Sequence, residues 1–365
     1  MKILTYFTHP SDYHLFKNAL KVLDKKGHII KVFGRHKGDL VDLLKADSFE
    51  FKIISSKLRK DSQLSAGLWL LKKDIIMFYH NLKFRPDILV GNCINITHMS
   101  KLFNKPSILI RDDDNISSLQ KASILSLPFA SIILTPKYTN MGKYSWKQIR
   151  YHGFKELAYL HPKVFRPTLE MVRKYINTNK QYTILRFVKL NAYHDAGKSG
   201  LTTEIAQRII HLLEPYGNIY ITSERKLEPQ FEKYRIKINP EDMHHALYFA
   251  DMYIGDSQTM AAEAAVLGTP SLRFNDFVGK LEYLEELEHK YGLTYGIKTS
   301  EPEKLYEKIK KILSIPNLKE VWQKRRKKML SEKINVTDFM VWFIENYPKS
   351  KEVMQRNPDY QFKFR

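Results

Sequence analysis

The stretch "DMYIGDSQTMAAEAAVLGTP", residues 251–270, decides how the rest of the sequence is interpreted. An apolar run ends at Gly255, four polar residues follow at 256–259, and a segment rich in alanine comes next. An apolar strand that leads through a short polar turn into a helix is typical of a unit in a parallel sheet. The alanines between 261 and 265 allow this helix to pack closely against the sheet. We therefore predict a helix over 258–267.

The polar turn has the chemistry of an anion site. The first N–H groups of a helix lack partners within the helix, and the helix dipole is positive there. Asp256, Ser257, Gln258 and Thr259 surround this position, and Glu263 lies one turn beyond Thr259 on the same helix face. A carboxylate there can accept two hydrogen bonds from a ribose diol, so the set fits a nucleoside diphosphate. The alternative is that Asp256 or Ser257 only caps the helix and that Glu263 is a surface acid.

The same alternation of strand and helix runs along most of the chain. Strands are predicted at 2–7, 28–34, 49–55, 87–91, 106–112, 130–136, 182–189, 218–223, 234–239, 252–257 and 271–276. Helices are predicted at 11–27, 39–47, a long stretch reaching residue 84, 202–213, 241–250 and 258–267, with three more helical patterns at the end. The strands are nearly continuous Ile, Leu and Val runs, which is typical of a parallel sheet covered on both faces.

The alternation is interrupted at residues 152–167, where Gly, two prolines and aromatic residues occur. We predict an α/β fold of two Rossmann-like domains, residues 1–160 and 166–335. The aromatic run 338–347 is too apolar for a free tail, so we expect residues 336–365 to return to the first domain. Ligands of such sheets bind at the carboxyl ends of the strands.

Ser257 and Glu263 resemble, in their six-residue spacing and in the "LGTP" that follows, the donor-nucleotide motif of the GT-B superfamily. In this superfamily, glycosyltransferases and UDP-N-acetylglucosamine 2-epimerases share two facing Rossmann-like domains. The usual Ser-Gly-Gly is replaced here by Ser257, Gln258 and Thr259, so phosphate contact through glycine backbone is not expected. Three further stretches resemble a domain-of-unknown-function family of GT-B proteins, and together they extend the resemblance to essentially the whole chain: "THPSDYHLFKNALKVLDKKGHIIKVFGR" (8–35), "ELAYLHPKVFRP" (156–167) and "ILRFVKLNAYHDAGKSGLT" (184–202).

Candidate catalytic residues lie on the acceptor side of the predicted cleft. His9, Asp12 and His14 follow the first strand, where a histidine can act as general base on a sugar hydroxyl. The alternative is that His14 is a histidine of a capped helix. Asp112 and Asp114 belong to "RDDDN", and consecutive carboxylates at a strand end are costly without a partner. The resemblance places the catalytic acid of the epimerases in this region.

Candidate donor-binding residues follow strands of the second half. Arg186, His194 and Lys198 lie in or beside a loop that contains glycine, and Ser223 ends the strand 218–223. Cations there can neutralise a diphosphate leaving group without a metal; the alternative is a flexible polar loop. The dinucleotide and P-loop glycine motifs and zinc spacings do not occur in the sequence. We expect no metal and no cofactor other than a nucleotide-sugar co-substrate, which the resemblance implies is UDP-linked.

The formal net charge of +21 is spread over 60 lysines and arginines, with the densest cluster at 324–328. This helix can face water, or it can lie on an anionic membrane with Trp322 and Met329 beside the charges. Nucleic-acid binding is a third possibility, but no recognised motif supports it. One cysteine, Cys93, suits a reducing compartment. No run approaches the ~20 apolar residues of a membrane span. The first residues predict a strand and not a signal peptide. We expect a cytoplasmic protein, or one peripheral at the inner membrane face.

These observations favour a nucleotide-sugar-dependent glycosyltransferase in polysaccharide biosynthesis, with a polysaccharide or a lipid-linked molecule as acceptor. An epimerase of the UDP-N-acetylglucosamine 2-epimerase kind is the alternative, with Asp112–Asp114 as its acids. A non-catalytic protein that binds sugar nucleotides is a second alternative. The basic face favours the transferase, because a soluble epimerase needs no membrane.

Overall fold

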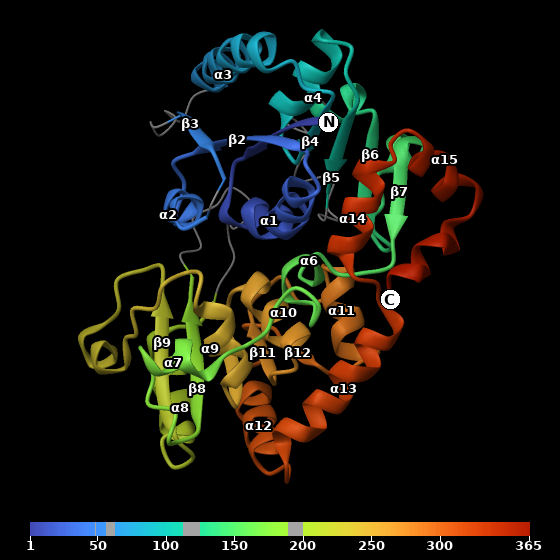
Figure 1. Cartoon of the computed structure of the whole chain (residues 1–365). Helices are drawn as coiled ribbons and strands as arrows, with labels where there is room; N and C mark the ends of the chain where they lie inside the picture. The colour runs from blue at the N-terminus through green and yellow to red at the C-terminus, as the bar shows by residue number, and fades with distance from the viewer. Residues whose placement is uncertain (48, 56–62, 112–124, 189–199) are drawn as a thin grey trace. The chain divides into compact units, whose positions relative to one another are not determined.

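The computed structural model describes residues 1–365 except residue 48 and residues 56–62, 112–124 and 189–199 (Figure 1). The chain forms two compact units. The first contains residues 1–159 and 333–365, and the second contains residues 160–332. Each unit has one parallel sheet with helices packed against it, so the predicted α/β fold with two Rossmann-like sheets is confirmed.

The first unit is built on a seven-stranded sheet of order β3-β2-β1-β4-β5-β6-β7. Its strands are β1 (Lys2–Phe7), β2 (Ile29–Arg35), β3 (Phe51–Ser55), β4 (Ile88–Gly91), β5 (Ser107–Ile110), β6 (Ile132–Pro136) and β7 (Gln148–Tyr151). Its first helices are α1 (Pro10–Lys25), α2 (Leu40–Lys45), α3 (Gln63–Phe84) and α4 (Ile94–Leu102), with 3₁₀ turns η1 (Leu127–Phe129) and η2 (Gly142–Lys147). The chain runs from β1 toward β3 and then returns to β4 on the other side of β1. The segments that follow β1 and β4 therefore diverge, which is where such sheets bind ligands.

The last segment of the chain belongs to the first unit. It forms α14 (Val336–Glu345), α15 (Lys349–Arg356) and η5 (Pro358–Phe364). Phe339 and Phe343 are fully buried, and the Thr337 hydroxyl donates to the Ala158 carbonyl at 2.6 Å. His28 lies 3.1 Å from the Glu345 carboxylate, which ties α14 to the start of β2. The aromatic run 338–347 is thus packed on the first unit.

The second unit contains a five-stranded sheet of order β12-β11-β10-β8-β9. Its strands are β8 (Tyr182–Phe187), β9 (Asn218–Ser223), β10 (Met252–Gly255), β11 (Ser271–Phe274) and β12 (Thr294–Ile297). Its helices are α7 (Leu169–Arg173), α8 (Thr203–Leu213), η4 (Pro229–Tyr234), α9 (Met243–Phe249), α10 (Gln258–Leu267), α11 (Glu282–His289), α12 (Pro302–Leu313) and α13 (Leu318–Glu332), while α6 (Leu157–Leu160) lies at the border of the two units. β9 lies on one side of β8 and β10 on the other, so the carboxyl ends of β8 and β10 form the second switch point.

The predicted strand 234–239 is wrong. Residues 229–234 form η4, and only one isolated bridge follows, between Ile221 and Arg235. The backbone N–H of Ile236 donates to the Ile221 carbonyl at 3.0 Å, but no ladder extends beyond it. The strands β7 and β12 and the helix α4 were not predicted from the sequence.

The prediction that Trp322 and Met329 can lie on a membrane beside the charges of 324–328 is also wrong. Trp322 and Met329 are fully buried, and the Trp322 indole N–H donates to the Leu293 carbonyl at 3.0 Å. Two of the five cations bond to backbone carbonyls, Arg325 to Gly292 at 2.6 Å and Arg326 to Val266 at 3.0 Å. α13 therefore packs its tryptophan and methionine into the unit and exposes only three lysines of the cluster.

Candidate functional site

The turn between β10 and α10 lies at the switch point of the second sheet. Ser257 is the N-cap of α10, and its hydroxyl accepts the Met260 N–H at 3.3 Å. Position 255 requires a glycine for a steric reason. A Cβ there would lie 2.5 Å from the Tyr253 hydroxyl and 2.9 Å from the Arg186 carbonyl. The glycine therefore allows β8 and β10 to approach where the helix begins.

The Asp256 carboxylate faces the backbone of its own unit. Its two oxygens accept the N–H groups of Val188 at 2.8 Å and Leu201 at 3.4 Å. Gly200 allows this approach, because a Cβ there would lie 2.5 Å from the carboxylate. Burial raises the pKa of Asp256 from its ordinary 3.8 to about 6. Asp256 therefore holds both ends of the segment that follows β8 and does not present its carboxylate to solvent.

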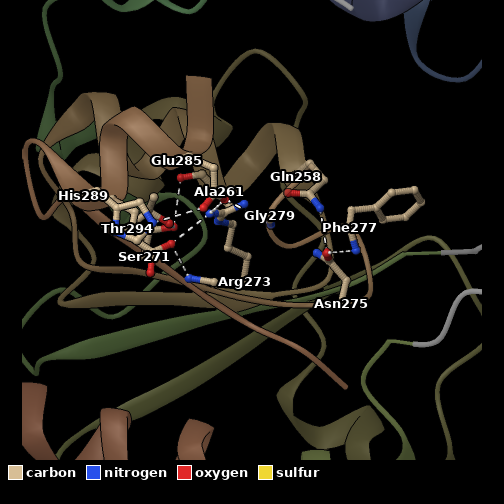
Figure 2. A network of polar contacts seen from close by, with 12 residues as sticks. Gln258, Ala261, Ser271, Arg273, Asn275, Phe277, Gly279, Glu285, His289 and Thr294 are labelled. Carbon is tan, nitrogen blue, oxygen red and sulfur yellow. Dashed lines mark hydrogen bonds and ion pairs between the residues drawn. The ribbon is translucent and has the colours of Figure 1, made fainter. Parts of the chain in front are cut away.

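A polar network continues from this turn to the end of β11 (Figure 2). The Gln258 amide donates to the Asn275 carbonyl oxygen at 2.6 Å, and the Asn275 amide donates to the Asp256 backbone carbonyl at 3.2 Å. The Phe277 N–H donates to the same Asn275 oxygen at 3.0 Å. Asn275 is fully buried, so it fixes the first residues of α10 against the sheet. Asn275 was not predicted as a site residue, although a polar residue directly after an apolar strand was a usable signal.

A buried arginine supports the same sheet edge (Figure 2). Arg273 on β11 is fully buried and bonds the carboxylates of Glu285 and Glu288, each at 2.9 Å. A buried cation is stable only when it is paired in this way. The Ser271 hydroxyl donates to the Ala261 carbonyl at 2.9 Å, which connects β11 directly to α10. The N-terminal end of α10 is therefore held by side chains of β11.

Glu263 is buried, so the alternative that it is a surface acid is wrong. Only 6% of the residue is exposed, and one carboxylate oxygen lies 3.2 Å from Nε2 of His244 on α9. Thr259 is partly buried on the same helix. His244 was not predicted as a site residue. Glu263 thus has a neighbour that orients its carboxylate, while its predicted contact with a ribose stays a prediction.

Two arginines lie at the carboxyl ends of β8 and β9. Arg186 is the next-to-last residue of β8 and forms an ion pair with Glu224. The Arg225 guanidinium donates to the Leu201 carbonyl at 2.8 Å, and the Arg225 backbone N–H donates to the Ser223 hydroxyl at 3.1 Å. Arg225 was not predicted as a site residue. The predicted His194 and Lys198 lie outside the described residues.

In the first unit, His9 and Asp12 form the cap of α1. The His9 ring accepts the Ser11 N–H at 3.2 Å, and Asp12 accepts the backbone N–H groups of Thr8 and His9 at 2.8 and 3.0 Å. This reciprocal arrangement is a capping box. The Asn92 amide lies 3.5 Å from the other Asp12 oxygen and connects the segments after β1 and β4. Burial raises the pKa of Asp12.

His14 lies inside α1 and is not the capping residue. It is buried, and its ring centroid is 5.4 Å from that of Tyr13 and 5.3 Å from that of Tyr159. His14 is thus a buried histidine within a capped helix, as the alternative predicted, and His9 is the N-cap residue. Asp112 and Asp114 lie outside the described residues.

The first switch point also contains a lysine that was not predicted as a site residue. Lys73 on α3 is buried, with its ammonium 3.5 Å from the Trp69 ring centroid and 5.7 Å from that of Tyr6. Burial lowers the pKa of Lys73 to about 8. A cation beside the carboxyl end of β1 can bind an anionic or hydroxyl-rich group. Helical spacing alone could not show that it points inward.

Other surfaces of the described residues offer less. A depression of about 610 Å³ lies along α8 and η4, and it is lined by mostly exposed side chains such as Arg208, Glu214 and Lys233. Among the described residues, no group of three or more His, Cys, Asp or Glu is placed to hold a metal ion. No helix in the described part of the chain is long and apolar enough to cross a membrane.

The chain is similar in structure to several solved proteins. The UDP-GlcNAc 2-epimerase from Neisseria meningitidis bound to UDP-GlcNAc has a TM-score of 0.68 at 15% identity, covering 94% of this chain and 99% of that one. The Methanocaldococcus jannaschii UDP-GlcNAc 2-epimerase in complex with UDP-GlcNAc and UDP has a TM-score of 0.61 at 13% identity, covering 87% and 94%. The spinosyn rhamnosyltransferase SpnG complexed with spinosyn aglycone has a TM-score of 0.59 at 14% identity, covering 95% and 100%.

These likenesses establish the fold, which is the GT-B fold that the sequence predicted. No curated protein sequence matches the chain. The family model described as Protein of unknown function (DUF354) matches residues 1–349, which is nearly the whole chain. The chain belongs to this family.

Proposed function

We propose that this protein is a nucleotide-sugar-dependent glycosyltransferase, with a UDP-linked donor bound at the β8–β10 switch point. The acceptor in this proposal is a lipid-linked molecule or a cell-surface polysaccharide. The observation that carries the proposal is the start of α10, where Ser257 and Gln258 lie at the positive end of a helix and Glu263 is buried further along it.

In this proposal the diphosphate and the ribose of the donor each have a partner. The diphosphate binds at the first turn of α10, beside the cations Arg186 and Arg225 at the ends of β8 and β9. Glu263 accepts the ribose hydroxyls, and His244 holds its carboxylate in place. The Asn275 network keeps the first turn of α10 rigid, which preorganises its donors. The similar structures named as epimerases include two with UDP-GlcNAc bound, which supports a UDP-linked donor.

Asp12 favours a second candidate, an epimerase of the UDP-GlcNAc 2-epimerase kind. Epimerisation needs groups that remove and return a proton, and the pKa of Asp12 is raised by burial toward the range useful for that role. The carboxylate lies at the switch point of the first sheet, next to Asn92. Its four hydrogen-bond contacts support a capping role equally well, so we rank this candidate second.

A two-arm assay separates the candidates. The full-length protein is incubated with UDP-N-acetylglucosamine alone, and then with the same donor plus a membrane extract that supplies acceptors. Mass spectrometry follows the sugar, and released UDP is measured in parallel. The transferase predicts UDP release that depends on the extract, together with a labelled lipid or polysaccharide product. An epimer or free sugar without extract would instead establish the second candidate.

A panel of UDP, GDP, CDP and TDP sugars extends the same assay to other donors. Glu263→Ala is the test variant, and Glu241→Ala, at an exposed position of the same unit, is its matched control. The proposal predicts loss of turnover only in Glu263→Ala. If both variants keep the activity of the unmodified protein, Glu263 does not hold the donor.

A further inference from the structure

The outward face of α3 is apolar along its described length. Six of its side chains are exposed and recur every three or four residues: Leu68, Leu71, Ile75, Phe78, Tyr79 and Leu82. Leu68 and Ile75 are 62% and 61% exposed. This spacing places the six on one face of the helix. A contiguous apolar face of this kind marks a contact surface and is unusual on a soluble monomer.

The opposite face of α3 is fixed to the first unit, so the outward face cannot simply rotate inward. Met77 is fully buried, and Asn81 is buried with its amide donating to the Met77 carbonyl at 2.8 Å. Asp74 accepts hydrogen bonds from Asn95 at 2.6 Å and His98 at 2.8 Å, which anchor α3 to α4. Figure 1 shows α3 at the outer side of its unit, with α4 beside it.

The apolar surface continues from α3 to its neighbours. The Phe78 and Phe103 rings lie 5.2 Å apart, next to the exposed Leu102. The His98 ring lies 5.7 Å from that of Phe129, and both Phe129 and Leu125 are exposed. We call the exposed apolar residues of α3, together with Leu102, Leu125 and Phe129, the α3 surface.

In the described segments 67–84, 94–105 and 125–147, the exposed charged residues are all lysines: Lys72, Lys83, Lys101, Lys105, Lys137 and Lys143. The single acid in these segments is Asp74, which is already bonded to Asn95 and His98. An apolar face bordered by lysines is the pattern of a helix that lies in a membrane interface. Tyr79 supplies the amphipathic ring that favours the headgroup level.

We propose that the α3 surface docks this protein on an anionic phospholipid bilayer. The apolar side chains enter the boundary between headgroups and acyl chains, while the lysines contact the anionic headgroups. A second copy of the chain is the poorer occupant. Two such surfaces facing each other would bring their lysines together on chains that each carry a net charge of +21. This inference goes beyond the proposed transfer reaction and does not depend on the donor site.

Vesicle sedimentation tests the inference with the full-length protein. Vesicles contain phosphatidylcholine alone, or phosphatidylcholine and phosphatidylglycerol in equal parts. The unmodified protein is expected to sediment with the anionic vesicles and much less with the neutral ones. The triple variant Leu71→Ser, Ile75→Ser, Leu82→Ser is expected to bind roughly a hundredfold more weakly, because partial burial of each aliphatic side chain contributes about fivefold.

Two control variants change the same chemistry elsewhere. Ile29→Ser with Tyr216→Ser removes two exposed apolar residues outside the α3 surface, and it is expected to bind as the unmodified protein does. Changing Lys324, Lys327 and Lys328 of α13 to Gln is expected to have little effect on binding. If the α13 variant abolishes binding and the α3 variant does not, the proposal is overturned.

A labelling experiment measures membrane contact while changing only one residue of the α3 surface. Cys93 is the only cysteine and is buried, so a cysteine introduced by Ile75→Cys can be labelled selectively with an environment-sensitive fluorophore. Its emission is expected to shift to the blue on anionic vesicles, whereas the same label at Tyr216→Cys is expected not to shift. Absence of any shift at Ile75→Cys would overturn the proposal. A dimer in analytical ultracentrifugation that the triple variant converts to monomer would also overturn it, in favour of a second copy.

Discussion

Replacing Asp256 by Asn is expected to change how the stability of the protein depends on pH. The Asp256 carboxylate is 4% exposed, and burial raises its pKa from 3.8 to about 6. At a pH between 3.8 and about 6, Asp256 keeps its proton in the native state and has released it in the unfolded state. The free energy of unfolding therefore falls as pH rises through this window.

The magnitude follows from the pKa difference. A difference of one in pKa corresponds to about 1.4 kcal/mol. The rise from 3.8 to about 6 therefore lowers the free energy of unfolding by about 3 kcal/mol across this pH range. Asn cannot ionise, so the free energy of unfolding of the variant lacks this decline with rising pH. It also turns an N–H₂ group toward the backbone N–H of Val188 or Leu201, which adds a penalty of roughly 1–3 kcal/mol that does not depend on pH.

Urea unfolding of the unmodified protein and Asp256→Asn at several pH values is the assay. Subtracting one curve from the other cancels the titration of every group that the two proteins share. The variant is expected to gain about 3 kcal/mol relative to the unmodified protein between about pH 3 and about pH 7. Asp42→Asn, at an exposed position of α2, serves as the control and should give a much flatter difference. Parallel curves for Asp256→Asn would refute the account of a buried, high-pKa carboxylate.

Three further changes have defined outcomes. Glu263→Ala is expected to weaken binding of a nucleotide sugar by ~1–3 kcal/mol in calorimetry, because ribose hydroxyls lose a charged acceptor; equal affinities in the variant and the unmodified protein would exclude this role. Trp322→Ala is expected to lower the free energy of unfolding by about 3–5 kcal/mol, since the fully buried indole also donates to a carbonyl; a loss below ~1 kcal/mol would mean that α13 does not depend on this residue. Ser257→Ala is expected to cost about 1 kcal/mol through loss of the α10 cap, measured in urea, and no loss would mean that the hydroxyl makes no cap in solution.

Local signals predicted α10 well and β12 not at all. The predicted helix 258–267 coincides with α10, because Ser257 marks its beginning and Gly268, with φ of 77°, marks its end. β12 is the four-residue strand "TYGI" with a glycine inside it, which has no strand signature. The need for that glycine appears only in the fold, where a Cβ at Gly296 would lie 2.9 Å from Val278.

The candidate site was predictable by position and not by side-chain direction. Parallel strands bring their carboxyl ends together, so Asp256, Ser257 and Gln258 were found at the turn after β10. The partners of the Asp256 carboxylate are Val188 and Leu201, far away in sequence, and no local pattern reveals them. For the same reason the helical pattern that reaches residue 84 did not show which side chains of α3 are exposed, since exposure depends on which neighbours cover them.

Hydrogen exchange with and without a nucleotide sugar tests most directly whether the switch point of the second sheet is the donor site. The full-length protein is exchanged in the presence and absence of UDP-N-acetylglucosamine, and peptides are resolved by mass spectrometry. The account predicts slower exchange in residues 255–263 and at the end of β8, with no change along α8 and η4. Slower exchange along α8 and η4 alone, or no change anywhere with any UDP, GDP, CDP or TDP sugar, would contradict it.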